Sequence, residues 1–237
     1  MIQEKFVEYE HGGSLLEGFL ACDDAGAAKK PAVMIVHAWA GRGEFECGKA
    51  RKLAELGYAG FAIDLYGKGV LGSSKEENGR LMQPFLDDRT LLQDRLTVAL
   101  NTLRNLPEVN SSKIAAMGFC FGGLSVLDLA RIGTDICGVA SFHGLFGAPG
   151  NTAGKKIKAK VLALHGHDDP MVPVDAVNAL EQELTEAGAD WQIHVYGNTM
   201  HAFTNPVAND PGFGTVYKEI ADKRSWQTLV NFLEEIF

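Results

Sequence analysis

One cysteine in this chain stands in a setting where a nucleophile is expected. Cys120 lies in the sequence Gly-Phe-Cys-Phe-Gly-Gly (118–123), which has the form Gly-x-nucleophile-x-Gly and directly follows a short apolar run. A sharp turn between a strand and a helix would lift the thiol clear of the backbone. The N–H groups that begin the helix would then favour a thiolate. The alternative is a glycine-rich junction in which Cys120 only packs.

Two further segments offer the partners that a thiol nucleophile needs. Asp169 lies in Leu-His-Gly-His-Asp-Asp-Pro (164–170) and His201 in Asn-Thr-Met-His-Ala-Phe (198–203), each after an apolar run typical of a strand. The order nucleophile, acid, histidine is that of an α/β-hydrolase triad. We predict that Cys120 attacks a carbonyl carbon, that His201 transfers protons, and that Asp169 orients the imidazole.

Other residues near these motifs have side chains that suit the same roles. Asp168 competes with Asp169 for the acid role, the alternative being a turn residue that bonds to backbone. His165 and His167 have no third ligand at a sensible spacing, so no metal site is predicted. His143 ends a predicted strand, where pocket-lining and structural roles are equally open.

The elements that must position these residues alternate between strands and helices. This alternation predicts an α/β fold with a mostly parallel central sheet and helices on both faces, in which functional residues follow the strands. An N-terminal hairpin (6–10 and 14–21) comes first, and a polar excursion lies at 72–80. The expected strands are 31–36, 58–64, 113–119, 138–142, 160–164 and 191–196, and the expected helices are about 44–57, 87–106, 120–132, 173–187 and 217–237.

Composition narrows the class of protein. We expect one domain over residues 1–237, with residues 1–21 as its hairpin, because no repeat or Gly/Ser/Pro-rich linker divides the chain. The formal net charge of −8 argues against nucleic acid or an anionic membrane surface as a partner. No apolar run is long enough to span a membrane, and the N-terminus lacks a signal-peptide pattern, which predicts a cytoplasmic protein. The oligomeric state cannot be read from the sequence.

The chain resembles the dienelactone hydrolase family from about Pro31 to the C-terminus. The cysteine is the most discriminating feature, since most α/β-hydrolases carry serine at this turn. The resemblance implies the α/β-hydrolase fold and a triad of Cys120, Asp169 and His201, with no cofactor. The matching segments are Gly-Phe-Cys-Phe-Gly-Gly (118–123), Asp-Pro-Met-Val-Pro (169–173), His-Ala-Phe (201–203) and Asp-Leu-Tyr-Gly (64–67).

An acyl-transfer enzyme of this kind also needs an oxyanion hole. The backbone N–H of Phe121, directly after the nucleophile, is the expected first donor. Trp39, in the loop after the first buried strand, is the expected second donor. Each such donor is typically worth about 2.7–4 kcal/mol in the transition state.

The sequence departs from the family pattern at two positions. Family members that hydrolyse dienelactone commonly carry Glu where this chain has Ala38, and that Glu interacts with the resting thiol. Its absence predicts a more constitutively reactive Cys120, unless Glu44 substitutes for it in space. The same members use Arg, four residues beyond the catalytic histidine, to bind a substrate carboxylate, and here that residue is Asn205.

These departures bear on the substrate. Arg80 or Arg89 could supply the missing charge, but arginines in such segments are more often exposed surface residues. A neutral ester or another lactone is therefore at least as plausible as dienelactone, in a pocket to which His143, Phe203, Ala38 and Asn205 are expected to contribute. The leading hypothesis is an ester or lactone hydrolase acting on a small molecule. The alternatives are a thiol-dependent peptidase or acyltransferase and a non-catalytic binding protein with this fold.

Overall fold

The computed structural model describes residues 1–23 and 28–237, which separate into two compact units. The first unit runs from Met1 to Met117 and the second from Gly118 to Phe237. The division falls within β5 (Val109–Phe119), the strand that leads to Cys120. That residues 1–237 form one domain stays a prediction.

The first unit is built on a mixed sheet that begins with the predicted hairpin. β1 pairs with β2 in antiparallel register, and the turn uses Gly12 and Gly13 at φ of +57° and +76°, which glycine adopts readily. β2 also pairs antiparallel with β4, and β4 pairs parallel with β3. The elements are β1 (Ile2–His11), β2 (Ser14–Asp23), β3 (Lys30–Val36), α1 (Glu44–Glu55), β4 (Ala59–Ile63), α2 (Lys75–Asp87) and α3 (Arg89–Arg104).

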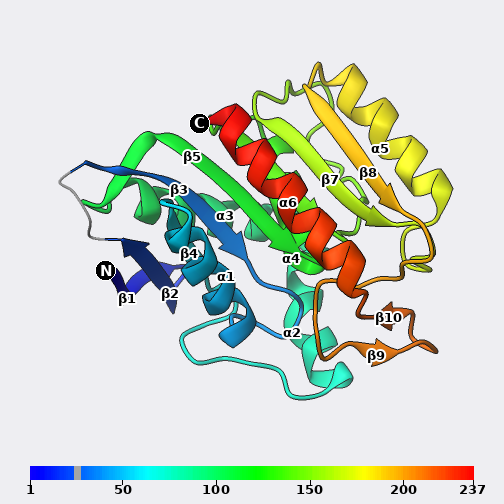
Figure 1. The fold of residues 1–237 in the computed structure, drawn as a ribbon, viewed down its shortest axis with the longest axis horizontal. Coiled ribbons are helices and arrows are strands. Elements are labelled where there is room, and N and C mark those ends of the chain that lie inside the picture. Colours follow the sequence, from blue (N-terminus) through cyan, green and yellow to red (C-terminus); the bar gives the residue numbers. More distant parts are fainter. Residues whose placement is uncertain (24–27) are drawn as a thin grey trace. The chain divides into compact units, whose positions relative to one another are not determined.

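Helices cover the inner strands of this unit. α1 contacts β2, β3 and β4, while α3 contacts β1 and β3. Figure 1 shows α1 in front of the strands and α3 behind them. β4 is buried along its whole length, as are the last five residues of β3, which explains why both strands read as unbroken apolar runs.

Residues 72–80, predicted as a polar excursion, are largely helical. α2 begins after Ser74, whose Oγ accepts a hydrogen bond from the Glu77 N–H at 3.1 Å. The helix predicted at 87–106 is confirmed as α3, which begins at Arg89 because Asp88 ends α2 and its carboxylate caps the first turn of α3. Capping side chains decide the structure of this segment, whereas the prediction relied on apolar periodicity.

The second unit has a parallel sheet. β6 pairs with β7 and β7 with β8, all in parallel register, so their carboxyl ends lie at one edge. The short antiparallel pair β9 and β10 was not predicted. The elements are α4 (Phe121–Arg131), β6 (Gly138–Phe142), β7 (Lys160–Gly166), α5 (Val174–Glu186), β8 (Trp191–Tyr196), β9 (Asn209–Asp210), β10 (Thr215–Val216) and α6 (Glu219–Ile236).

The core of the second unit lies between this sheet and its helices. α4 and α6 both contact β6, and Figure 1 shows α6 in front of the strands and α4 behind them. β6 is buried throughout. Parallel strands flanked by helices confirm the predicted α/β class. In the part of the chain that is described, no helix is both long and apolar enough to cross a bilayer.

Candidate active site

Cys120 is the single residue between the end of β5 at Phe119 and the start of α4 at Phe121. Its backbone has φ of +54° and ψ of −113°, an unfavourable conformation for a residue with a Cβ. The Cys120 N–H donates to the carbonyl oxygen of Phe142, at the end of β6, at 3.0 Å. Its carbonyl oxygen accepts from the Leu124 N–H at 3.1 Å. A strained turn held in this way has the geometry of a nucleophile elbow.

Two glycines make this turn possible. A Cβ on Gly118 would lie 2.1 Å from the carbonyl oxygen of Gly122, so the strand could not pass the helix so closely. A Cβ on Gly123 would lie 2.6 Å from the Cα of Gly144, in the loop after β6. Both distances are well inside van der Waals contact. The glycines around Cys120 are therefore required by backbone packing on two sides of the elbow.

Cys120 is the residue that directly precedes the first turn of α4. The N–H groups of a helix's first turn have no acceptor within the helix itself, and the positive end of the helix dipole favours an anion there. Every residue of α4 is buried, so this field is weakly screened by water. Phe121 is the first residue of the helix and directly follows Cys120, which fits its predicted role as an oxyanion donor.

His201 lies in the segment after β8, where backbone hydrogen bonds fix it on both sides. Its N–H donates to the carbonyl oxygen of Gly214, and its carbonyl oxygen accepts from the Val216 N–H, each at 3.0 Å. The side chain is buried, and Nδ1 lies 2.7 Å from Oδ2 of Asp169. His201 and Asp169, which are 32 residues apart in the sequence, are thus joined by a direct hydrogen bond.

The structure distinguishes the two aspartates after β7. Asp169 is buried, and its second carboxylate oxygen accepts a hydrogen bond from the Met171 N–H at 2.8 Å. Asp168 is exposed, and its N–H donates to the carbonyl oxygen of Thr199 at 2.9 Å. His201 is therefore paired with Asp169, while Asp168 bonds to backbone as a turn residue.

The charges around His201 favour its protonated form. Burial alone would lower the pKa of His201. The charge of Cys120, together with the hydrogen bond and charge of Asp169, outweighs burial and raises this pKa to about 10. Nε2 of His201 is buried and has no hydrogen-bond partner of normal geometry among the described residues. The thiol is thus close enough to act on the imidazole electrostatically. An imidazolium beside a thiol favours the thiolate, the nucleophilic form.

Two of the predicted pocket residues pack around the histidine. The ring of His143 lies 5.1 Å from that of His201 and 5.1 Å from that of Phe203, and both His143 and Phe203 are buried. Asn205 turns back on its own loop, where Oδ1 accepts from the Val207 N–H at 3.2 Å. Contact of His143, Phe203 or Asn205 with a substrate stays a prediction.

Ala38 and Trp39 belong to the first unit, in the loop after β3. The Ala38 N–H donates to Oε1 of Glu46 at 3.3 Å, and the carbonyl oxygen of Trp39 accepts from the hydroxyl of Tyr66 at 3.0 Å. The loop is therefore held by side chains of its own unit. That Trp39 is the second oxyanion donor, and that Ala38 lines the pocket, stay predictions.

The carboxylate beside Ala38 is not the one that the sequence suggested. Glu44 forms an ion pair with Arg51 on the surface of α1. Glu46 is buried, and its carboxylate accepts hydrogen bonds from the N–H groups of Ala38 and, at 2.9 Å, Gly43. Burial raises the pKa of Glu46 to about 7. The sequence could have indicated the bond between Glu46 and Gly43, because a glutamate at the third position of a helix often accepts a hydrogen bond from the N–H of the residue before the helix.

The remaining histidines and arginines of the motifs have ordinary surroundings. Among the described residues, no three His, Cys, Asp or Glu side chains are arranged to hold a metal ion. His165 is buried with its ring 5.6 Å from that of Phe146, and burial lowers its pKa. His167 is exposed, and Arg80 forms an ion pair with Glu77 on the surface.

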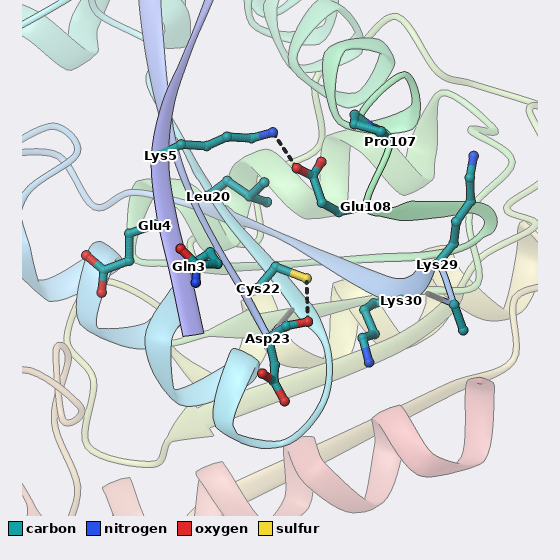
Figure 2. A pocket seen from close by; sticks show the side chains of 11 residues that line it. Gln3, Glu4, Lys5, Leu20, Cys22, Asp23, Lys29, Lys30, Pro107 and Glu108 are labelled. Carbon is teal, nitrogen blue, oxygen red and sulfur yellow. Dashed lines mark hydrogen bonds and ion pairs between the residues drawn. The ribbon is translucent and has the colours of Figure 1, made fainter. Parts of the chain in front are cut away.

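A second thiol, Cys22 in β2, lines a cavity of about 470 Å³ in the first unit. Figure 2 shows this cavity, with an ion pair between Lys5 and Glu108 at one side and the Cys22 thiol donating to the carbonyl oxygen of Asp23 at 3.7 Å. Burial raises the pKa of Cys22. No histidine is among the described residues that line the cavity. Cys22 thus has a cavity but no base.

Most of the chain is similar in sequence to known proteins. The sequence model of the dienelactone hydrolase family matches residues 16–237. A putative carboxymethylenebutenolidase of Synechocystis sp. is 26% identical over 202 residues, which are 79% of this chain and 81% of that protein.

Two solved structures are similar in fold as well as in sequence. The structure titled m3DLH has a TM-score of 0.95 at 34% identity, and the match covers 100% of this chain and 99% of that one. A dienelactone hydrolase-like promiscuous phosphotriesterase, P91, from metagenomic libraries has a TM-score of 0.93 at 34% identity with the same coverage. The chain therefore belongs to the dienelactone hydrolase family and is a hydrolase of esters or lactones.

Proposed function

We propose that this enzyme cleaves a carboxylic ester or lactone with Cys120 as nucleophile, His201 as proton carrier and Asp169 as the group that orients His201. One observation carries the proposal. His201 is bonded to Asp169 through Nδ1, while its other nitrogen has no partner of normal geometry among the described residues and the Cys120 charge acts on the ring. Such an imidazole can exchange a proton with whatever lies beside the thiol.

The first step is attack by the Cys120 thiolate on the substrate carbonyl carbon. A carbon–sulfur bond forms, and the electron pair of the carbonyl double bond moves to its oxygen. The negative charge on that oxygen would be stabilised by the Phe121 N–H and the N-terminus of α4, which lie next to the nucleophile. These donors are fixed before the substrate arrives, so they need no reorganisation during the reaction.

The second step breaks the carbon–oxygen bond of the ester. The oxyanion collapses, and His201 gives its proton to the departing alkoxide, which leaves as an alcohol or, in a lactone, stays attached to the acyl group. Cys120 now carries the acyl group as a thioester. Before the attack, a pKa of about 10 keeps His201 protonated at neutral pH, and the Cys120 charge that helps to raise this pKa is lost when the carbon–sulfur bond forms. Asp169 stabilises the charged imidazole and holds it in one tautomer.

The third step releases the acid. Neutral His201 takes a proton from a water molecule, the resulting hydroxide attacks the thioester carbon, and the carbon–sulfur bond breaks to return the thiolate. The carboxylic acid product then loses its own proton to solvent. Cys120 and His201 are left as the thiolate and imidazolium with which the cycle began.

For the substrate we propose a small, neutral ester or lactone. At the position where some family members use Arg to bind a carboxylate, this chain has Asn205, which bonds to its own loop. A phosphotriester is a second candidate substrate, because a relative that is 34% identical over the full chain is described as a promiscuous phosphotriesterase. A thiolate can also attack phosphorus, in line with the departing p-nitrophenolate or alkoxide, whereas it attacks a carbonyl carbon from above the carbonyl plane.

The test is pre-steady-state hydrolysis of p-nitrophenyl acetate. We expect a burst of p-nitrophenolate equal to the enzyme concentration, an acetyl group on Cys120 in the quenched protein, and loss of both in Cys120→Ala. The variant should lose about 10⁴-fold or more in kcat/KM. The same assay with diethyl p-nitrophenyl phosphate measures the phosphotriester activity.

Cys22→Ala is the matched control, because it removes a buried thiol that has no histidine beside it. It should retain kcat/KM within about twofold. Hydrolysis by Cys120→Ala at the rate of the unmodified enzyme would refute the proposed nucleophile. An acetyl group found on Cys22 instead of Cys120 would do the same.

A further inference from the structure

Three consecutive residues, from the last residue of β6 onward, connect the nucleophile to the base. Phe142 accepts the hydrogen bond from the Cys120 N–H at 3.0 Å. Gly144 packs against Gly123, which leaves no room for a side chain on either. His143, between Phe142 and Gly144, directs its side chain toward the other half of the site. The segment therefore contacts the elbow with its backbone and the base loop with a side chain.

His143 makes two kinds of contact with the loop that carries His201. Its Nε2 lies 2.8 Å from Oγ1 of Thr204, a side chain that is fully buried three residues after His201. Its ring meets the His201 ring edge to face, at 5.1 Å between centroids and 65° between planes. The same ring meets Phe203 at 5.1 Å and 80°. Residues 201, 203 and 204 are thus all held by one imidazole.

The backbone of His143 is unfavourable for a residue with a side chain. Its φ is +38°, in the left-handed region, which costs about 1–2 kcal/mol for a non-glycine residue. The conformation is fixed by the His143 N–H, which donates to the carbonyl oxygen of Leu164 in β7 at 2.8 Å. A position with positive φ would ordinarily be filled by glycine or asparagine. The histidine side chain thus has contacts that a glycine could not make.

From this geometry we infer that His143 is a positioning residue for the reaction, an inference that rests on the proposed triad. Its ring limits the rotation of the His201 imidazole, and its bond to Thr204 fixes the loop. Asp169 alone restrains one nitrogen of His201 but leaves the ring free to swing about that bond. Because the His143 ring packs against the His201 ring, the His201 ring keeps its Nε2 on the side of Cys120.

A direct catalytic role for His143 is disfavoured by the same contacts. The nitrogen through which it bonds is engaged with Thr204, and the ring is enclosed by the aromatic side chains of Phe119, Phe203 and His201. The side chain is only 2% exposed. His143 therefore acts through His201.

The experiment compares substitutions at both ends of the His143–Thr204 bond. Thr204→Val keeps the shape of the side chain but removes the hydroxyl, and Thr204→Ser keeps the hydroxyl. His143→Phe keeps an aromatic ring without the bond, and His143→Gln returns a polar group at the end of the side chain. We expect Thr204→Val and His143→Phe to lower kcat for p-nitrophenyl acetate about 10- to 100-fold, with KM within about threefold.

Two readouts separate positioning from general damage to the fold. Thr204→Ser and His143→Gln should recover most of kcat, and Thr204→Val combined with His143→Phe should cost little more than either alone, because both remove one interaction. The pH dependence of Cys120 alkylation should shift in the two damaging variants, since the charged imidazole no longer stays beside the thiol. A purely structural role would lower Tm but leave the pH profile of the folded enzyme unchanged.

Cys120→Ala, assayed in parallel, keeps the outcomes distinct. If Cys120→Ala is inactive while Thr204→Val and His143→Phe match the unmodified enzyme in kcat and in alkylation profile, the inference about His143 is wrong and the triad stands. If Cys120→Ala remains active, the proposed function itself fails.

Discussion

Buried polar side chains gather near strand ends in both units, and they differ in what they bond to. In the first unit, the Tyr9 hydroxyl donates to the Asp64 carbonyl oxygen at 2.6 Å and accepts from the Asp64 N–H at 2.8 Å. Arg95 donates to the Leu65 carbonyl oxygen at 2.6 Å, and Nε2 of His37 accepts from the Leu65 N–H at 3.2 Å. Each of these bonds ends on the backbone of the turn after β4.

In the second unit, the polar groups near the elbow retain unused hydrogen-bonding capacity. Nε2 of His201, Nδ1 of His165 and Oγ of Ser141 are buried without a hydrogen-bond partner among the described residues. Leaving such groups unpaired costs about 1–3 kcal/mol each. The first cluster therefore stabilises a turn, whereas the second holds groups at some cost in stability.

One pair of matched substitutions tests this difference most strongly. Asp169→Asn removes the charge that orients His201, and it should lower kcat about 10⁴-fold with a small change in Tm. Asp64→Asn removes a carboxylate whose oxygens accept three backbone N–H bonds, at 2.8–3.3 Å. That change should cost about 3 kcal/mol in the free energy of unfolding. The measurements are kcat on p-nitrophenyl acetate, corrected for folded protein, and denaturant unfolding.

The comparison between the units makes opposite predictions for the two asparagine variants. Folded Asp64→Asn should keep kcat close to that of the unmodified enzyme, because the lost hydrogen bonds hold backbone only. A 10³-fold loss of kcat in Asp64→Asn without loss of stability would show that the first cluster takes part in the chemistry. The interpretation of the second cluster would be overturned if Asp169→Asn unfolded the protein but left kcat unchanged.

The two thiols provide a second, smaller contrast. At pH 7 we expect iodoacetamide to modify Cys120 about 100-fold faster than Cys22, because a protonated imidazole favours the thiolate of Cys120, whereas burial raises the pKa of Cys22. Peptide mass spectrometry over time gives both rates in one sample. His201→Ala should slow only the Cys120 reaction. Equal rates at the two cysteines would contradict the proposed ion pair, and with it the prediction, from Ala38, of a constitutively reactive thiol.

The parts of the site that could be predicted from sequence are those that local pattern determines. The glycines at 118, 122 and 123, an apolar strand before them and a helix after them specify the elbow around Cys120. Chain order, together with the family resemblance, then selected His201 and Asp169, and the structure pairs these two. Each of these sequence features lies within a few residues of the side chain that it positions.

The missed contacts depend on tertiary structure or on side-chain capping. His143 and Thr204 are 61 residues apart, and neither residue type at those positions signals a bond to the other. α2 was missed because its start is set by the Ser74 cap, and Phe85 is the one apolar side chain of this helix that is buried. The residues 24–27 lie outside the described part of the chain. Contacts between distant segments and competition among caps are thus what a single sequence leaves undetermined.

Glu46 offers the smallest test of the comparison, because it is a buried acid of the first unit whose hydrogen bonds do not offset its burial. Its pKa is raised from 4.5 to about 7. In this interval the folded protein holds a proton that the unfolded chain has released. The free energy of unfolding must therefore fall as pH rises from about 4.5 to about 7, by up to about 3 kcal/mol.

Glu46→Gln removes this titration and should flatten the fall. The amide still offers one oxygen to the N–H groups of Gly43 and Ala38, so any fixed cost of the substitution is the same at every pH. Measured by urea unfolding at pH 5 and pH 8, the variant should gain stability relative to the unmodified protein as pH rises. Glu44→Gln, two residues away with a carboxylate that is 81% exposed, is the control and should change nothing in this dependence. A parallel pH dependence in Glu46→Gln and the unmodified protein would mean that the hydrogen bonds at Glu46 fully compensate its charge.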